Sequence, residues 1–533
     1  MNKSPFLTRR DLLAMIGKTA GAGALYSAMT TLGFAKPSTF TGELNLSKAP
    51  SGGSVLVLGA GLAGMTAAYE LRKAGYDVTI LEYNERPGGR CYTIYSGDTF
   101  TELSGETQYC DFAEGNYFNP GPWRVPYHHY GLLHYCKKFG VKLQPFIQIN
   151  YNAYVHAQHA FGGKPQRMRE VLTDVHGYTS ELLAKATNQH ALDDVLTKED
   201  CDALLEQLNE WGHLTGDYQY QKSLKASEYR GYEDWPAGGL MPKPFASEPL
   251  DFKELLHSGL WGMLLDYFNT EYQQTMFEPV DGMEQIARGF AGEVGDLIKY
   301  RKQVVRIKQS DTEVTVNYID PDHPDDVMTL TADWCVCTIP LSVLSQIPVE
   351  ASPALLQAIA AIPYGSSVKT GLEFSRRFWE QDESIFGGVT YTDMPITTIS
   401  YPAYDYFSDG PAVLLGAYTF DNASSYTMSA MTGRERVALA VAYGKQIHPQ
   451  YEKEFLSGVS WSWHRSPWSL GCYGLWTEQL RAAHYDTLCA IDNRLVLAGE
   501  HCSYLPAWQE GAILSGMDAS QRLHAKATAT ASA

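Results

Sequence analysis

Residues 54–90, SVLVLGAGLAGMTAAYELRKAGYDVTILEYNERPGGR, constrain the fold more than any other part of this chain. Val55–Leu58 is a continuous apolar run, typical of a parallel strand that is buried on both faces. Gly59, Gly61 and Gly64 follow with the G-x-G-x-x-G spacing at the start of a helical pattern. The first glycine permits a tight turn, the second lets the backbone approach a pyrophosphate, and the third packs the helix against the sheet. The segment therefore predicts a dinucleotide-binding unit.

An acid ends the second strand of this unit, which the pattern places at Asp77–Glu82. Glu82 lies about 20 residues after the glycines, where a carboxylate accepts hydrogen bonds from ribose hydroxyls and disfavours a 2′-phosphate. The phosphates are expected at the positive end of the helix over residues 61–74. Arg90, in the second glycine turn RPGGR, adds a cation that is able to meet the same pyrophosphate.

Motifs near the C-terminus extend this interpretation. Leu495–His501 (LVLAGEH) is a strand pattern that ends in a glycine and an acid, and Trp508–Gly516 (WQEGAILSG) opens a glycine-flanked helix. Together with residues 54–90, these segments resemble the flavin-dependent amine oxidase family, which includes monoamine, polyamine and L-amino acid oxidases. The resemblance implies FAD as cofactor and an α/β fold: a Rossmann-like, glutathione-reductase-like FAD-binding domain, an antiparallel-sheet substrate domain and a helical insert.

The resemblance also implies which residues bind the cofactor. They come from the glycine turns, the end of the second strand, a loop before the insert, a hairpin strand and the C-terminal motif. They are Gly59, Ala60, Gly61, Leu62, Ala63, Gly64, Glu82, Arg90, Gly121, Pro122, Trp123, Arg124, Val304, Gly499, Glu500, Gly511, Ala512 and Ile513. In the family, Val304 corresponds to a backbone contact to adenine, and the last helix points its N-terminus at the flavin ring.

One lysine is the candidate catalytic residue. Tyr364–Trp379 resembles the family's strand whose single lysine holds a water against flavin N5, and Lys369 occupies that position. An ammonium flanked by Val368, Leu372 and Phe374 carries a desolvation cost, which indicates a functional role. The alternative is a lysine whose head reaches solvent from a strand end.

A second segment implies the substrate. Asn119–His129 (NPGPWRVPYHH) resembles the G-P-x-R-x-P segment of L-amino acid oxidases, in which the arginine, here Arg124, clamps the substrate carboxylate. A guanidinium fork fits a carboxylate with two parallel charge-assisted bonds. Tyr418 ends a strand where these oxidases place a hydroxyl on the same carboxylate, and Ala507 and Trp508 are placed to line the substrate cavity. The alternatives are a surface arginine in a turn and aromatic rings that serve core packing.

The activity that the resemblance implies is oxidative deamination of an L-α-amino acid by FAD and O2 to a 2-oxo acid, ammonia and hydrogen peroxide. Three alternatives stay open: a flavin oxidase of polyamines or arylalkylamines with a structural Arg124, a flavin monooxygenase that yields an amide, and a non-enzymatic FAD-binding scaffold. Gly365 stands where some venom-type relatives have arginine, and no motif locates the histidine that those enzymes are proposed to use as a base. No general base is assigned.

Cysteine and histidine patterns add one candidate. Trp468–Gly474 (WSLGCYG) resembles the G-C-Y segment through which monoamine oxidases link the flavin 8α-methyl carbon to a cysteine, so Cys472 is a candidate covalent link. The alternative is a small residue packed beside the flavin dimethylbenzene ring. The 9 cysteines show no C-x-x-C spacing. The pairs His128–His129 and His156–His159 lack a carboxylate or cysteine at ligand spacing, so no metal site is predicted.

The N-terminus and the net charge indicate location and partners. Thr8–Leu13 (TRRDLL), before a Gly- and Ala-rich stretch, resembles a twin-arginine export leader, which predicts a periplasmic or secreted bacterial protein without a stable membrane anchor. A net charge of −18 argues against nucleic acid or an anionic membrane surface as partner. The expected partners are the L-amino acid, O2 and, as in much of the family, a second copy in a homodimer.

At 533 residues the chain exceeds a single core, and the motif positions divide it into interleaved domains. Residues 1–40 are predicted as the signal peptide; 52–115, 275–345 and 465–525 as the FAD-binding domain; 116–124 and 346–464 as the substrate-binding domain; and 125–274 as the helical insert.

Overall fold

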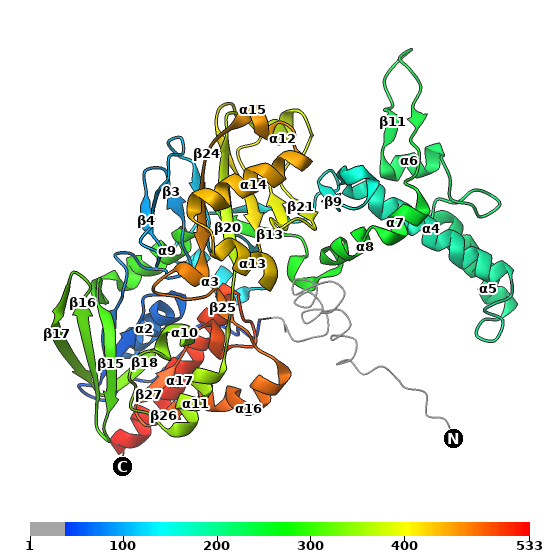
Figure 1. Ribbon diagram of the computed structural model, residues 1–533. Helices are drawn as coiled ribbons and strands as arrows, with labels where there is room; N and C mark the ends of the chain where they lie inside the picture. Colours follow the sequence, from blue (N-terminus) through cyan, green and yellow to red (C-terminus); the bar gives the residue numbers. More distant parts are fainter. Residues whose placement is uncertain (1–37, 533) are drawn as a thin grey trace.

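A six-stranded sheet joins the beginning, the middle and the end of the chain (Figure 1). The computed structural model describes residues 38–532, so residues 1–37 of the predicted export leader lie outside the described part. The strands, in spatial order, are β14 (Ile298–Lys299), β2 (Asp77–Leu81), β1 (Ser54–Leu58), β18 (Trp334–Cys337), β27 (Leu495–Leu497) and β26 (Ile491–Asp492). All neighbours are parallel except β26 and β27.

Successive side chains of β1 point to opposite faces of the sheet, and a separate hydrophobic core covers each face. Val55 and Val57 face a layer formed by α2 (Leu62–Ala74), α3 (Tyr130–Lys138), α9 (Glu284–Val294) and α17 (Gln509–Ser532). Leu56 and Leu58 face the other side, where a three-stranded sheet of β15 (Gln303–Gln309), β16 (Val314–Asp320) and β17 (His323–Ala332) packs with α11 (Pro353–Ala361) and α16 (Glu478–Cys489). Burial on both faces explains the continuous apolar run in the sequence.

A second sheet of seven strands carries Lys369 and Tyr418. Its order is β10 (Gln166–Arg167), β9 (Tyr154–His156), β21 (Val389–Thr392), β22 (Thr398–Ser400), β23 (Ala412–Tyr418), β20 (Val368–Phe374) and β24 (Phe455–Ser462). Only the pair of β9 and β21 is parallel. All seven residues of β20 are buried, and the strand has a neighbour on each side, β23 and β24. Register places Lys369 directly opposite Tyr418.

Residues 125–274 separate into several parts. The helix α3 packs against α17 and α9, and β9 and β10 join the second sheet. β7 (Val125–Pro126) and β8 (Leu143–Phe146) pair with β13 (Met276–Pro279), and the helices between residues 168 and 263 form an arm that extends to one side of the two sheets (Figure 1). Its helices are α4 (Met168–Asn188), α5 (Lys198–Trp211), α6 (Leu224–Arg230), α7 (Phe252–His257) and α8 (Leu260–Met263).

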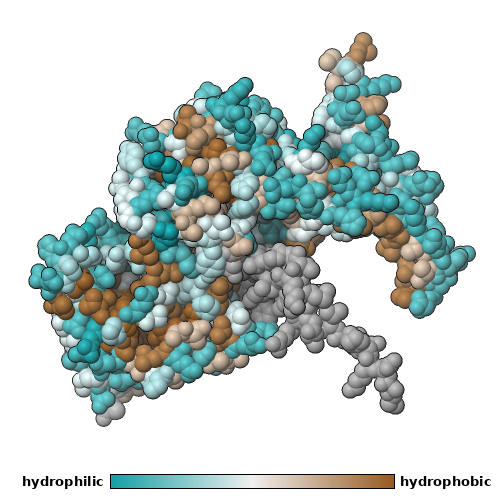
Figure 2. Space-filling view, in the orientation of Figure 1, coloured by the Kyte–Doolittle hydropathy of each residue, from teal (hydrophilic) through white to brown (hydrophobic). Residues whose placement is uncertain are grey.

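The surface mixes polar and apolar side chains, and apolar ones gather along part of the arm (Figure 2). Exposed apolar side chains of the arm include Leu182, Leu183, Trp211, Leu240 and Met241. Within residues 38–532, no helix combines the length and the apolar character that a membrane crossing requires.

Candidate active site

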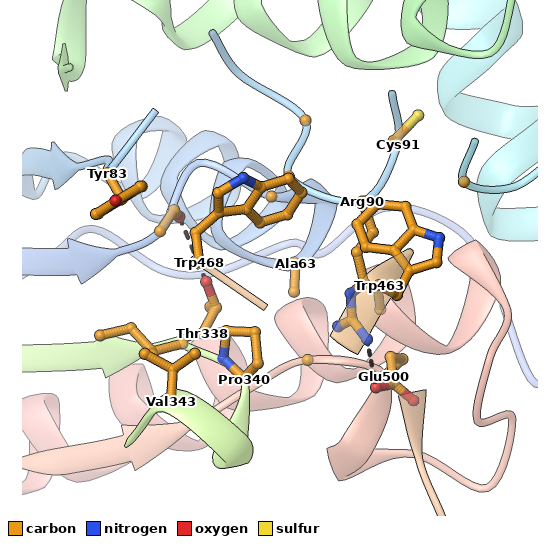
Figure 3. A pocket seen from close by; sticks show the side chains of 18 of the residues that line it. Ala63, Tyr83, Arg90, Cys91, Thr338, Pro340, Val343, Trp463, Trp468 and Glu500 are labelled. Atoms are coloured by element: carbon orange, nitrogen blue, oxygen red, sulfur yellow. Dashed lines mark hydrogen bonds and ion pairs between the residues drawn. The ribbon is translucent and has the colours of Figure 1, made fainter. Parts of the chain in front are cut away.

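One cavity of about 510 Å³ follows the carboxyl ends of the parallel strands. Gly59, Glu82, Thr338 and Gly499 line it, and each stands within two residues of the end of a strand. Open α/β sheets bind ligands at this edge. Figure 3 shows Tyr83 and Val343 towards one end of the cavity and Arg90, Trp463 and Glu500 towards the other.

The first glycine turn is shaped for a closely approaching ligand. Gly59 has a φ of +105°, and a Cβ there would lie 2.6 Å from Thr338 Oγ1. A Cβ on Gly64 would lie 2.0 Å from the Gly59 carbonyl oxygen, so this glycine packs the helix onto the turn. Gly61 precedes α2, lines the cavity and has open space at its Cβ position. At the N-terminus of this 13-residue helix, no side chain separates the backbone of Gly61 from the cavity, and such a site suits a pyrophosphate.

Glu82 and Arg90 are both held by protein groups at the cavity. Glu82 Oε2 accepts from the Ala60 N–H at 2.6 Å, and Oε1 accepts from the Asn84 N–H at 2.8 Å. Arg90 Nη1 donates to Glu500 Oε1 at 2.9 Å and to the Cys472 carbonyl at 2.6 Å (Figure 3). The guanidinium thus ties the second glycine turn to the C-terminal motif.

The C-terminal helix approaches α2 through glycine. A Cβ on Gly516 would lie 2.5 Å from the Ala63 carbonyl oxygen, and one on Gly511 would lie 2.3 Å from the Leu505 carbonyl oxygen. These contacts bring the beginning of α17 to the cavity, where Ala512 lines it, whereas the Ile513 side chain is in the core.

The cavity lining contains two thirds of the residues that the sequence assigns to the cofactor. These are Gly59, Gly61, Leu62, Ala63, Glu82, Arg90, Gly121, Pro122, Val304, Gly499, Glu500 and Ala512. The other six, which do not border it, are Ala60, Gly64, Trp123, Arg124, Gly511 and Ile513. Lining residues that were not predicted include Thr338, Pro340, Val343, Trp463 and Trp468. The strand pattern that ends at Cys337 is the one signal that could have indicated the first of them.

Lys369 is buried beside two aromatic rings. Its Nζ donates to the Gly121 carbonyl at 2.5 Å and to the Asn119 carbonyl at 3.4 Å. The Nζ lies 4.1 Å from the Tyr418 ring centroid and 4.8 Å from that of Trp123. Burial lowers the pKa of Lys369 well below its ordinary value; Cys472 opposes this shift, and the positive charge of Arg124 adds to it. The buried amine therefore gives up its proton more readily than a lysine in solvent.

Arg124 lies behind the cavity among aromatic rings. Its guanidinium carbon is 4.2 Å from the Tyr272 ring centroid, 4.6 Å from that of Trp123 and 5.9 Å from that of Trp508. Nη1 donates to Gln148 Oε1 at 3.0 Å, and Nε has no hydrogen-bond partner among residues 38–532. A buried guanidinium with an unused donor is a site for an anion.

Three further predicted substrate residues border the cavity near Arg124 and Lys369: Tyr418, Ala507 and Trp508. Ala507 has a φ of +67°, and its N–H donates to Glu500 Oε2 at 3.2 Å. The buried Trp508 Nε1 has no hydrogen-bond partner among the described residues. Gln148 and Tyr272 were not predicted, because residues 125–274 contain no motif that marks them.

Cys472 also borders the cavity, and its carbonyl accepts a hydrogen bond from Arg90. Burial raises the pKa of its thiol to about 11, while Arg90 and Lys369 lower it. The thiol is therefore protonated near neutral pH in the free protein.

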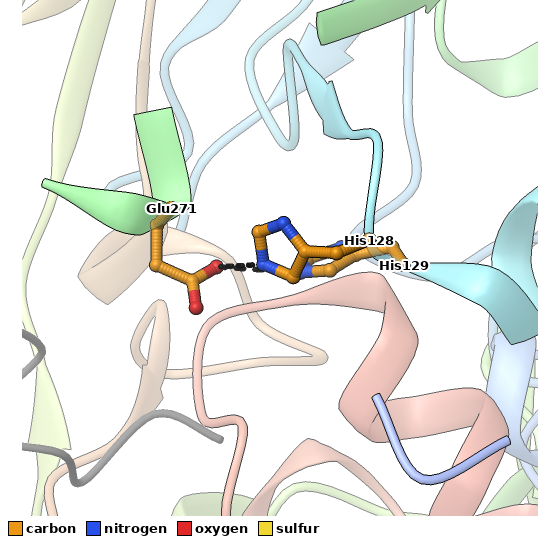
Figure 4. A group of neighbouring side chains, drawn as sticks. All are labelled: His128, His129 and Glu271. Atoms are coloured by element: carbon orange, nitrogen blue, oxygen red, sulfur yellow. Dashed lines mark hydrogen bonds and ion pairs between the residues drawn. The ribbon is translucent and has the colours of Figure 1, made fainter. Parts of the chain in front are cut away.

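The histidine pair has a carboxylate neighbour that the sequence does not indicate. No metal site was predicted because His128 and His129 have no carboxylate nearby in the sequence. The structure supplies one from a distant segment: Glu271 Oε2 lies 3.2 Å from His128 Nε2 and 3.4 Å from His129 Nε2 (Figure 4). These three side chains form the histidine–glutamate cluster, in which one donor atom of each lies within 4.8 Å of the others.

Comparisons with known proteins agree with this geometry. The model of the flavin containing amine oxidoreductase family matches residues 62–524. The L-amino-acid oxidase of Siganus canaliculatus is 28% identical over 477 residues, which are 88% of this chain and 85% of the relative. That of Notechis scutatus scutatus is 28% identical over 485 residues, 88% and 86% of the two chains. The solved cyclohexylamine oxidase from Brevibacterium oxydans IH-35A shares the fold, with a TM-score of 0.58 at 18% identity over 89% of this chain and 99% of that one.

Proposed function

This chain belongs to the flavin containing amine oxidoreductase family, and we propose that within it the chain is an L-amino acid oxidase. It is an FAD-dependent oxidoreductase. The observation that carries the narrower proposal is Arg124, a buried guanidinium with an unused donor beside Trp508, which borders the cavity. An oxidase of simple amines has no carboxylate for that group to bind.

The described residues fit FAD. The bare backbone at Gly61 and the N-terminus of α2 suit its pyrophosphate, and Glu82 at the end of β2 suits its ribose. Val304 and Gln303 line the cavity near that end, and Gly499 and Ala512 line it at the other. When bound, FAD takes up two electrons and a hydrogen from the substrate and passes the electrons to O2.

The chain itself contributes position, desolvation and a buried amine. Arg124 binds the substrate carboxylate, and Tyr418 and Trp508 exclude water around the reacting carbon. Holding the reactants in one orientation is worth roughly 7–11 kcal/mol of the barrier when alignment is good. Lys369, held by the carbonyls of Gly121 and Asn119, is a buried amine whose lowered pKa suits it to exchange a proton with a water beside it.

The test of the proposal is peroxide release by the purified, FAD-loaded protein. The substrates are the twenty L-amino acids, their D-enantiomers, and a set of primary amines and polyamines. We expect signal with L-amino acids only, because Arg124 selects the carboxylate and the aromatic walls fix its orientation. Signal confined to amines contradicts the assignment of Arg124, and substrate consumption without peroxide indicates the amide-forming monooxygenase.

Glu82→Gln should weaken FAD binding. The substitution removes the negative charge that accepts from ribose hydroxyls, and a charge-assisted hydrogen bond contributes about 1.5–3 kcal/mol, so the Kd for FAD should rise about 10- to 100-fold. Flavin fluorescence quenching during reconstitution of the apoprotein measures it. Glu85→Gln is the matched control, since Glu85 pairs with Arg301 at the surface. An unchanged Kd in Glu82→Gln would refute the ribose role.

The proposal extends to location and assembly. The Thr8–Leu13 pattern supports export by the twin-arginine route to the periplasm or the medium. Family resemblance supports a homodimer, and the G-C-Y pattern supports a thioether at Cys472. Residues 116–124 and 346–464 are proposed as the substrate domain, residues 125–274 as the insert that shapes entry.

A further inference from the structure

We propose that His128, His129 and Glu271 bind a divalent transition-metal ion of the zinc type. The three side chains are buried: their residues are 7%, 0% and 2% exposed. They come from two segments that are far apart in the sequence, the loop before α3 and the 3-10 helix η4 (Thr270–Tyr272). Figure 4 shows the two imidazole rings and the carboxylate converging from these segments.

Charge balance in the cluster calls for a cation. Glu271 is a buried carboxylate, and the ion pairs of its side chain with described residues are those with the two histidines. A buried carboxylate is costly unless a positive charge accompanies it. A metal ion between neutral imidazoles supplies that charge without protonating either ring.

The unused atoms of the cluster belong to His129, whereas His128 Nε2 is hydrogen-bonded to Glu271 Oε2 at 3.2 Å. Neither ring nitrogen of His129 has a hydrogen-bond partner among residues 38–532, although Nε2 lies 3.4 Å from the carboxylate. Zinc–ligand bonds of about 2.0–2.1 Å place tetrahedral ligand atoms about 3.3 Å apart. The two nitrogen–oxygen distances, 3.2 and 3.4 Å, are of this length, and all three donor atoms lie within 4.8 Å of one another. Two imidazoles and one carboxylate are the ligand types that zinc accepts.

The position of the cluster gives the ion a structural consequence. The His129 ring meets the Trp508 ring edge to face, with centroids 5.0 Å apart. Glu271 directly precedes Tyr272, whose ring packs on Arg124. A metal ion would therefore fasten η4 to the loop before α3 and brace two of the rings around Arg124. This placement does not depend on which substrate Arg124 binds.

Zinc counting on the FAD-loaded protein tests the proposal. Wild type and variants are incubated with ZnCl2, passed over a desalting column, and analysed for zinc per chain by mass spectrometry and for melting temperature. We expect about one zinc in wild type, a higher Tm with zinc, and loss of both effects in Glu271→Gln and in His129→Gln. His159→Gln, at an exposed histidine beside Asp393, is the matched control and should keep the zinc.

A second probe guards against variants that fail to fold. Co²⁺ in place of zinc should give wild type the strong visible absorption bands of tetrahedral Co²⁺. These bands should disappear on addition of excess zinc. Flavin absorbance reports folding of each variant, and His128→Gln replaces any variant that loses flavin. Wild type that keeps no zinc and shows no cobalt bands, or variants that keep as much zinc as wild type, would overturn the proposal.

Discussion

Arg124→Met should abolish most turnover of L-amino acids while leaving the flavin in place. Methionine keeps the unbranched apolar stem between Trp123 and Tyr272 but removes every donor. Losing one partner of a buried, hydrogen-bonded charge pair costs about 2–5 kcal/mol, so kcat/KM for the preferred amino acid should fall at least about 30-fold. The fall for the corresponding amine, which has no carboxylate, should be small. Steady-state peroxide assays on both substrates measure the ratio.

Arg481→Met is the matched control for this experiment. Arg481 also lies over aromatic rings, those of Trp476, Tyr485 and Tyr504, but it does not border the cavity. Its replacement should leave the amino acid to amine ratio unchanged. Arg124→Lys should recover only part of the loss, because an ammonium lacks the planar fork that meets two carboxylate oxygens. Equal losses on amino acid and amine in Arg124→Met contradict a carboxylate clamp and favour an amine oxidase.

Local chemistry explains which parts of the fold were predictable. The turn at Gly59, Gly61 and Gly64 needs backbone conformations and close approaches that glycine alone permits, so its spacing is visible in the sequence. The strand at Val55–Leu58 is buried on both faces, and its composition shows it. In both cases, the residues that determine the local structure are neighbours in the sequence.

The parts that escaped prediction depend on contacts between distant segments. Gln148, two residues after β8 (Leu143–Phe146), reaches Arg124, and Glu271, in η4, reaches the histidine pair. Neither residue stands in a pattern that its neighbours share. The pairing of α3 with α17 is of the same kind: the Gly131 and Leu132 N–H groups donate to Glu510, almost four hundred residues away. Sequence patterns identify such residues only when a motif surrounds them.

Lys369→Met is the second large effect, and it should slow turnover while making the protein more stable. A positioned proton-transfer group contributes about 10²- to 10⁴-fold to a rate, so kcat should fall at least 100-fold with FAD still bound. Stability should rise because methionine fills a similar volume without a polar head. The buried lysine costs the wild-type protein free energy, about 1.4 kcal/mol for each unit by which burial lowers its pKa.

The pH dependence of stability tests the lowered pKa of Lys369. Because burial lowers the pKa of Lys369 in the folded state, the unfolded chain binds an extra proton at every pH between that folded value and the ordinary value of 10.5. The free energy of unfolding of wild type therefore rises with pH across this window, and that contribution should be missing from Lys369→Met. Denaturant unfolding at several pH values measures it. Val368→Ala, on the same buried strand, is the control that should lose stability and keep the wild-type pH slope. A methionine variant of unchanged kcat would contradict the catalytic role, and one whose unfolding free energy depends on pH as in wild type would contradict the lowered pKa.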